Sequence, residues 1–556
     1  MKRALSIFVV ITIFISVFTS YNLLKGKESK DDNEKATNNK PITLTMYSQD
    51  PNGDEDGFQN PVAKEITKAT GVTLKIRYPV GNVAEDISLM IASKEYPDLV
   101  FSKGEQLNQL VSASSLIDLT PLIDKFGPNI KKLYGNYMNR NKYSINDKSI
   151  YTLGSSAVTS GKLEPVMGFE LQHAVVKELG YPKIETVKDF ENAIFTYKQK
   201  HPTINGKKTI GLSLIASEWR WNIGIGNGAG FATGAPDDGN WYIDPVTFDA
   251  VYRFTRSSEK EYYRWLNHMN SINLIDPDSF VQKYDQYLAK IADGNVLGLI
   301  DAKWDYSGGE NKLNVDKSYE RTYGMYPVQL DKSTTSADFR EYGYSGGWGF
   351  GITANSEHKE DAMKFIDWMS SDTAQILNNW GIEGINYKTI NGKREITDEE
   401  WEKRNNDENY PRETGVGVYS YPFPSRGIGK KDSSGQFYIP SNAQNIMKNY
   451  NPVEKEVLSA YGKAMWRDFY PASKDLPASS WGMGFMINIP SDSDIALIMQ
   501  KCTYVMEKGT IKAIMAKPSE FDGIWDNLMK ELEENEVDKM NKHFTKLVKE
   551  RVEMWK

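Results

Sequence analysis

Residues 42–101 alternate between segments that favour strands and segments that favour helices. Helices are expected from Pro61, which follows the capping residue Asn60, and over 83–93. Three short apolar runs on either side of these helices have strand character: ITLTM (42–46), VTLKIRY (72–78) and PDLVF (97–101). The order β-α-β-α-β implies a parallel, doubly wound α/β unit. Because the chain has 556 residues, there is room for two to four domains.

The loops after these strands are candidate ligand sites. In doubly wound units, ligands bind beyond the carboxyl ends of the strands. The loop at 47–57 contains Asp50, and a second loop covers 102–106. Asp50 is therefore a candidate ligand-binding residue.

The first forty residues predict an exported protein. Lys2 and Arg3 precede an uncharged apolar run from Ala4, the form of a secretory signal. The run continues to Leu24, long enough to span a bilayer, so residues 1–24 are either a cleaved signal peptide or a retained signal anchor. We favour retention, because the run continues past the small residues that could be cleaved. The polar stretch 25–40 is expected to be a disordered tether, and the body lies outside the cytoplasm.

Composition excludes several classes of protein. The net charge is −7, and the excess of acidic over basic side chains is larger still in the residues that follow the first forty. Because binding to nucleic-acid phosphates needs clustered Lys and Arg, this charge argues against a nucleic-acid partner. The single cysteine, Cys502, excludes internal disulfides and is expected to be buried. The five histidines are widely separated, so neither a histidine-built metal site nor a cofactor is expected. The 31 Tyr and 13 Trp favour a ligand with flat apolar faces.

Two glycine-rich motifs resemble catalytic or cofactor signatures but fail in context. GYSGG (343–347) has the spacing of a nucleophile elbow, yet a strand-like segment follows Ser345 where a helix is required. We expect it to be a crossover that lets Tyr344 and Trp348 face a cleft. GIGNGAG (224–230) lacks the spacing of a phosphate-binding loop and is expected to be an open loop. A glycosidase would need two carboxylates across a cleft, which sequence cannot show, so that alternative stays open.

Later elements are also predictable. A helix should follow Thr186, and a buried strand should occupy 296–300. Further helices are predicted over 259–274, around 284–291, over 358–369, and from about 495 to 556.

Tryptophans beside glycine and polar residues form the most informative pattern. Such rings pack on the C–H faces of sugars while Asn, Asp, Glu and Arg satisfy hydroxyl groups. The candidate ligand-binding residues are Asp50, Trp219, Trp221, Asn222, Asn227, Trp304, Asp305, Tyr344, Trp348, Trp380, Glu383, Asn386 and Tyr387.

The chain resembles extracellular solute-binding proteins of ABC importers, of the large oligosaccharide-binding type found as lipoproteins in Gram-positive bacteria. The resemblance covers about residues 41–555. It rests on TGVTLKI (70–76), EYPDLVF (95–101), DLTPLIDKFGPNIKKL (118–133), KELGYPKIETVKDF (177–190), NLIDPDSF (273–280), KIADGNVLGLI (290–300) and the segment 345–387, which ends in GIEGINY.

The resemblance implies a two-lobed periplasmic-binding-protein-like α/β fold with hinge crossovers and a helical C-terminal part. The expected N-lobe is 41–153 plus about 300–370, and the expected C-lobe is about 154–299 plus 371–556. The implied function is capture of an oligosaccharide between the lobes and delivery to permease subunits, by a monomer that is not an enzyme. An oligopeptide-binding importer protein is the main alternative, and a secreted glycoside-active enzyme is a second.

Two departures from the family matter. FTSYNLL (18–24) has no lipobox cysteine, which excludes lipid anchoring through cysteine. The stretch HPTINGKKTIG (201–211) has no carboxylate where some members have an acidic loop that suits calcium, so no metal is expected there.

Overall fold

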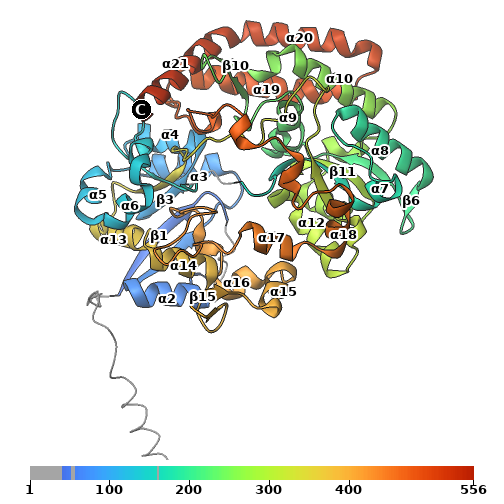
Figure 1. The fold of residues 1–556 in the computed structure, drawn as a ribbon. Coiled ribbons are helices and arrows are strands. Elements are labelled where there is room, and N and C mark those ends of the chain that lie inside the picture. The colour runs from blue at the N-terminus through green and yellow to red at the C-terminus, as the bar shows by residue number, and fades with distance from the viewer. Residues whose placement is uncertain (1–40, 52–56, 159–161) are drawn as a thin grey trace, which may run out of the picture. The chain divides into compact units, whose positions relative to one another are not determined.

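The computed structural model describes residues 41–51, 57–158 and 162–556 (Figure 1). The predicted signal segment and tether lie outside these residues. Within the described part of the chain, no helix is both long enough and apolar enough to cross a bilayer.

The first sheet contains the strands predicted near the N-terminus. Its order is β2-β1-β3-β13-β4. The strands are β1 (Ile42–Ser48), β2 (Val72–Arg77), β3 (Leu99–Ser102), β4 (Leu153–Gly154) and β13 (Gly349–Ile352). β1 pairs in parallel with β2 and β3, whereas β13 runs antiparallel to β3 and β4. The sheet is therefore mixed rather than wholly parallel, because β13 enters it from another part of the fold.

The first two helices begin and end where the sequence predicts. In α2 (Pro61–Thr70), the Asn60 side chain accepts a hydrogen bond from the Ala63 amide at 2.9 Å, and Gly71 closes the helix with a φ of 74°. α3 (Val83–Ser93) is capped by Asn82. The β-α-β-α-β order is confirmed. The other helices on this side are α4 (Gly104–Ser112), α5 (Thr120–Phe126), α6 (Pro128–Tyr134), α13 (Lys359–Met369), α14 (Asp372–Trp380), α15 (Asp398–Asn406) and α16 (Tyr410–Thr414).

The second sheet has the order β12-β5-β11-β8. Its strands are β5 (Met167–Gln172), β8 (Ile210–Ser213), β11 (Val296–Ala302) and β12 (Tyr323–Tyr326). The helices around it are α7 (His173–Glu178), α8 (Val187–Lys200), α10 (Ser257–Ser271), α11 (Tyr284–Ala292), α12 (Lys303–Val315) and α18 (Pro452–Ala460). The predicted buried strand at 296–300 is confirmed as β11, and Thr186 with Asp189 forms a capping box on α8.

Three helices end the chain, as predicted: α19 (Asp494–Met515), α20 (Phe521–Glu534) and α21 (Val537–Trp555). Their apolar faces, including Cys502, Trp525 and Phe544, pack in the same core as the second sheet. Cys502 is fully buried, as expected, and burial raises the pKa of its thiol to about 11.

The chain crosses between the sheets three times. Residues 155–166 join β4 to β5, and residues 327–348 join β12 to β13. The third passage leaves the first core after Phe423, includes α17 (Ala443–Asn449) and reaches α18 (Figure 1). These passages touch, since the Ser155 amide donates to the Trp348 carbonyl at 3.2 Å and the Val158 amide to the Ser425 carbonyl at 3.0 Å.

Sheet membership differs from the division expected from the sequence at two places. β12 and the end of β11 lie in the second sheet, although residues 300–370 were expected with the first. Tyr410 and Phe423 pack in the core of the first sheet, although residues beyond 371 were expected with the second.

The glycine-rich segment 224–230 is helical, not the predicted open loop. A π-helix (η2, Asn222–Asn227) continues into α9 (Gly228–Ala232). The glycines permit close packing: a Cβ on Gly228 would lie 2.6 Å from the Tyr262 hydroxyl oxygen and 2.7 Å from the Ile300 side chain. The segment is therefore fixed against α10 and β11.

Candidate functional site

Two exposed tryptophan rings lie together at the surface. Of the thirteen tryptophans, all within the described residues, Trp219 and Trp304 are the most exposed, at 49% and 53%. Their ring centroids are 5.9 Å apart and the rings are stacked at 21°. Trp304 is the second residue of α12, just after β11 ends at Ala302, and Trp219 lies in the turn before η2. The pair offers a flat apolar surface to a ligand.

Arg220 fixes this pair from one side. Its guanidinium lies 4.3 Å from the Trp219 ring centre and 3.7 Å from that of Tyr284. Its Nε donates to the Asp305 carboxylate at 3.0 Å. Asp305 is only 2% exposed, and burial raises the pKa of its carboxyl. Asp305 therefore holds Arg220 in place instead of facing open space.

A cavity of about 240 Å³ adjoins Trp304. Two of the three crossovers contribute to its wall, with Lys162 from the first and Asp338, Arg340 and Tyr342 from the second. The start of β5, the loop at 236–238 and the loop at 479–483 complete the lining. The cavity thus lies where the chain passes from one sheet to the other.

The cavity wall carries charges of both signs. Lys162 pairs with Asp338 at 3.2 Å. Asp238 accepts hydrogen bonds from the Trp481 indole at 3.1 Å and from the Gly484 amide at 2.6 Å. Burial raises the pKa of Asp238 to about 7 and also raises that of Asp237. Polar groups of this kind orient a ligand that carries many hydroxyls.

Of the two predicted asparagines, Asn227 contacts residues that line this cavity. Asn227 is buried, and its amide faces Asp237 and the Met167 sulfur, both at 3.4 Å. Asp237 and Met167 line the cavity, so Asn227 supports its wall. Asn222 lies one helical turn earlier in η2, and its side-chain oxygen is buried without a hydrogen-bond partner among the described residues.

Trp348 and Asp50 form a second group. The Trp348 ring packs on Phe485 at 5.1 Å, and the Lys103 ammonium lies 5.1 Å from the ring centre. Lys103 in turn pairs with Asp50 at 2.7 Å, and the Tyr421 hydroxyl donates to Asp50 at 2.8 Å. A Cβ on Gly239 would lie 2.9 Å from Phe485, so this group reaches the loop beside Asp238.

Other candidate residues are part of the protein interior. Trp221 is 1% exposed, stacks on Phe254, and donates its indole N–H to Thr510 at 3.1 Å. Tyr344 is fully buried, so only Trp348 of the predicted pair at the crossover is accessible.

The GIEGINY segment forms a structural turn away from the cavity. Trp380 is buried and donates to the Phe437 carbonyl at 3.0 Å, with Tyr387 packed edge-on against it. Asn386 is buried and donates to Glu400 and to the Tyr410 hydroxyl, each at 3.2 Å. Glu383 is exposed on this turn. These four residues do not line the 240 Å³ cavity.

The charged residues of the cavity were not among the candidates predicted from the sequence. Lys162, Asp237, Asp238, Asp338 and Arg340 line the cavity. Among them, only Asp237 and Asp238 have a local sequence pattern, the turn PDDGN at 236–240. Lys162, Asp338 and Arg340 become neighbours of this turn only when the crossovers meet.

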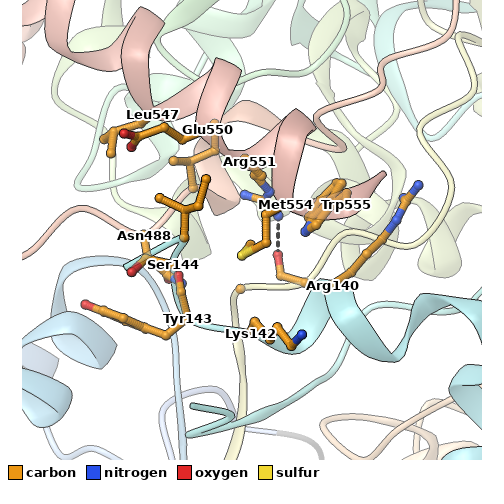
Figure 2. Close-up of a pocket in the computed structure, with 14 residues that line it drawn as sticks. Arg140, Lys142, Tyr143, Ser144, Asn488, Leu547, Glu550, Arg551, Met554 and Trp555 are labelled. Carbon is orange, nitrogen blue, oxygen red and sulfur yellow. Dashed lines mark hydrogen bonds between the residues drawn. The ribbon is translucent and has the colours of Figure 1, made fainter. Parts of the chain in front are cut away.

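A smaller cavity of about 40 Å³ lies where α21 meets residues 140–145 (Figure 2). The guanidinium groups of Arg140 and Arg551 lie 4.4 and 4.2 Å from the Trp555 ring centre. Arg551 donates to the Gly346 carbonyl at 2.6 Å, and Arg140 to the Tyr344 carbonyl at 2.7 Å. Burial, together with the nearby charge of Arg140, lowers the pKa of Arg551 to about 9. Both arginines thus hold the carbonyl groups of the second crossover.

Residues 51–376 match the family model described as bacterial extracellular solute-binding protein. The chain belongs to this family. It is 21% identical to lipoprotein LipO of Bacillus subtilis (strain 168) over 424 residues, which cover 72% of this chain and 79% of the relative.

Solved structures share the fold of this family member. Alginate-binding protein AlgQ2 without calcium ion aligns with a TM-score of 0.66 and 15% identity, over 93% of this chain and 100% of that one. The S. pneumoniae ABC-transporter substrate-binding protein FusA in complex with kestose gives 0.67 and 17%, over 91% and 99%. The fold is thus the two-lobed periplasmic-binding-protein-like α/β fold, with hinge crossovers and a helical C-terminal part.

Proposed function

We propose that this solute-binding protein captures an oligosaccharide of two or more units in the 240 Å³ cavity and delivers it to the permease of an ABC importer. The observation that carries this proposal is the stacked pair Trp219 and Trp304, half exposed at the edge of a cavity whose wall includes charged side chains. Sugars present apolar C–H faces to such rings and hydroxyl groups to the polar side chains of the wall.

The cavity is small, so an oligosaccharide bound in it would extend beyond its opening. A volume of 240 Å³ lies below the roughly 300–1,000 Å³ typical of ligand sites. One sugar unit would occupy the cavity, and the next would lie over Trp304 and Trp219.

The names of similar proteins agree with a sugar ligand. AlgQ2 is named as alginate-binding, and FusA was solved with kestose. We extend this ligand class to the present chain because its exposed tryptophans adjoin the crossovers, where a hinge would close on the ligand.

The proposed site retains part of the set predicted from the sequence. Trp219 and Trp304 stack on the sugar, Asn222 and Asn227 support the wall, and Trp348 with Asp50 forms the opposite edge. We leave out the buried Trp221, Asp305 and Tyr344 and the turn that contains Trp380, Glu383, Asn386 and Tyr387.

We add three further features to the proposal. The protein binds without catalysis, acts as a monomer outside the cytoplasm and has no nucleic-acid partner. The proposed first lobe is 41–154 plus 349–423, and the second is 167–326 plus 452–556, with the crossovers between them.

The retained segment 4–24 would anchor the chain, since no lipobox cysteine is present. N-terminal sequencing of protein from its native host should then yield the unprocessed start. A mature N-terminus between Ser20 and Leu24, with the protein in the medium, would contradict the anchor and leave the binding function untouched.

A thermal-stability panel of oligosaccharides and peptides tests the binding function. A ligand that binds only the folded chain raises the melting temperature. We expect at least one oligosaccharide to do so and peptides to have no effect. Stabilisation by peptides alone would favour the oligopeptide importer instead, and chemical breakdown of the sugar would favour the enzyme.

A further inference from the structure

Arg340 is a buried cation whose side chain forms no direct hydrogen bond or ion pair with the described residues, and Asp238 and Asp244 act on it only from a longer distance. It lies on the second crossover and lines the 240 Å³ cavity, and only 8% of its surface is exposed. Its Nε and Nη1 are buried and find no hydrogen-bond acceptor among the described residues. Within that part of the chain, its side chain also forms no ion pair within 4.0 Å. A guanidinium that is removed from water in this way needs an acceptor to offset its lost hydration.

Other buried arginines of the chain do have such acceptors. Arg253, 1% exposed, pairs with Glu259 at 2.9 Å. Arg551 donates to a backbone carbonyl, as described above. Arg340 departs from this pattern, and it does so at the wall of the ligand cavity.

Each carboxylate of the cavity has at least one protein donor, although Oδ2 of Asp238 and Oδ2 of Asp338 are buried without one among the described residues. Asp338 pairs with Lys162, and Asp238 accepts hydrogen bonds from Trp481 and Gly484. Asp237 lies 3.4 Å from the Asn227 amide nitrogen and from the Gly239 backbone nitrogen. Burial raises the pKa of Asp237 and Asp238 and lowers that of Arg340. Asp238 and Asp244 act on the Arg340 charge from beyond ion-pair distance, but no described residue supplies a hydrogen-bond acceptor to its Nε or Nη1.

We propose that the oligosaccharide carries a carboxylate, as in a uronic acid unit, and that Arg340 binds this group. The proposal rests on the sugar-binding function proposed above and names the substrate class of the same cavity. A planar guanidinium matches the two oxygens of a carboxylate through parallel hydrogen bonds. Trp304, which lines the same cavity, would pack on the sugar ring.

An amino sugar is the opposite possibility, because three aspartates line the same cavity. It is disfavoured because each of these carboxylates already has a protein donor within 3.4 Å, whereas Arg340 has no acceptor. Sulfated sugars share the anionic character but lack the planar group.

The test is calorimetric titration of the full-length chain with trimers matched in length. The panel contains an oligogalacturonate, its neutral carboxyl-reduced form, a sulfated neutral trimer and an amino-sugar trimer. The wild type should bind the oligogalacturonate at least tenfold more tightly than each of the others. Arg340→Gln should remove this preference, Arg340→Lys should keep only part of it, and the exposed control Arg77→Gln should keep all of it.

The outcomes separate the two proposals. Three results would overturn the carboxylate assignment while leaving sugar binding intact. They are equal affinity for the oligogalacturonate and its neutral form, a preference for the amino-sugar or sulfated trimer, and an unchanged affinity of Arg340→Gln for the oligogalacturonate. Failure of every trimer to bind would overturn sugar binding itself.

Folding and salt provide independent readouts. Because the Arg340 side chain has no direct partner among the described residues, Arg340→Gln should melt at the wild-type temperature or above it. If that variant is instead unstable, the wild-type protein alone provides the test. Its affinity for the oligogalacturonate should fall as the salt concentration rises, and its affinity for the carboxyl-reduced trimer should not. An affinity for the oligogalacturonate that does not change with salt concentration would contradict the carboxylate assignment.

Discussion

Trp219 and Trp221 are two residues apart in the sequence and have opposite environments in the fold. Trp219 is half exposed and stacks on Trp304, whereas Trp221 is buried against Phe254 and Thr510. The helical backbone that starts at Arg220 turns the two rings to different sides. Their substitutions should therefore affect different properties.

Trp304→Ala should weaken ligand binding by about 1–3 kcal/mol and leave folding nearly unchanged, because the ring is half exposed. Trp221→Ala should instead lower the free energy of unfolding by about 3–5 kcal/mol. Calorimetric titration and urea unfolding of both variants separate these effects. The assignment fails if Trp304→Ala unfolds the protein, or if it binds the ligand like the wild type.

Asp238 predicts a specific pH dependence of stability. Burial raises its pKa from the ordinary value of 3.8 to about 7. The folded state then holds the proton more tightly than the unfolded state, so its stabilising effect is complete below 3.8 and is lost as the pH rises to about 7. In that window the wild type should lose about 1.4 kcal/mol per pH unit relative to Asp238→Asn. Urea unfolding at several pH values measures this difference, and a constant difference would show that Asp238 titrates normally.

The exposed tryptophans of the proposed site could be predicted from the sequence, whereas its charged residues could not. Trp304 could be predicted because it follows a strand that is recognisable from its own residues. Arg340 and Lys162 could not be, because they lie on different crossovers and become neighbours only after both sheets form. Trp221 and Trp380 were expected at the ligand because loop and core tryptophans have similar sequence surroundings.

Among the elements, those with local capping signals were predicted well and the glycine-rich helix was not. Asn60 with Gly71, and Thr186 with Asp189, mark helix ends through contacts only a few residues apart. The helix of residues 220–232 is different. Gly228 packs against Tyr262 and Ile300, which are distant in the sequence and leave no room for a Cβ atom.

Gly228→Ala tests this explanation at the level of the helix. The added methyl group would lie 2.6 Å from the Tyr262 hydroxyl oxygen, so the free energy of unfolding should fall by about 1–3 kcal/mol. The matched control is Gly523→Ala in α20, where no atom lies within 4 Å of the new Cβ, and it should be neutral or stabilising by about 0.4–1 kcal/mol. Equal effects of the two changes in urea unfolding would contradict the packing argument.

At the scale of the whole molecule, the crossovers connect the two sheets and the proposed site. They contribute to the wall of the 240 Å³ cavity, and Arg140 and Arg551 donate hydrogen bonds to two carbonyl groups of the second crossover. The β-α-β-α-β order of residues 42–101 could be predicted from the sequence, whereas the antiparallel entry of β13 into the first sheet could not. The assignment of β12 and residues 410–423 was not, because a chain that crosses three times can return to either sheet.

The most direct test of ligand capture is titration of the mature chain with the best oligosaccharide of the stability panel, followed by chromatography of the recovered sugar. We predict one ligand per chain, recovered unchanged, and loss of binding in the double variant Trp219→Ala, Trp304→Ala. Recovery of shortened sugars, or undiminished binding by the double variant, would contradict the proposed function.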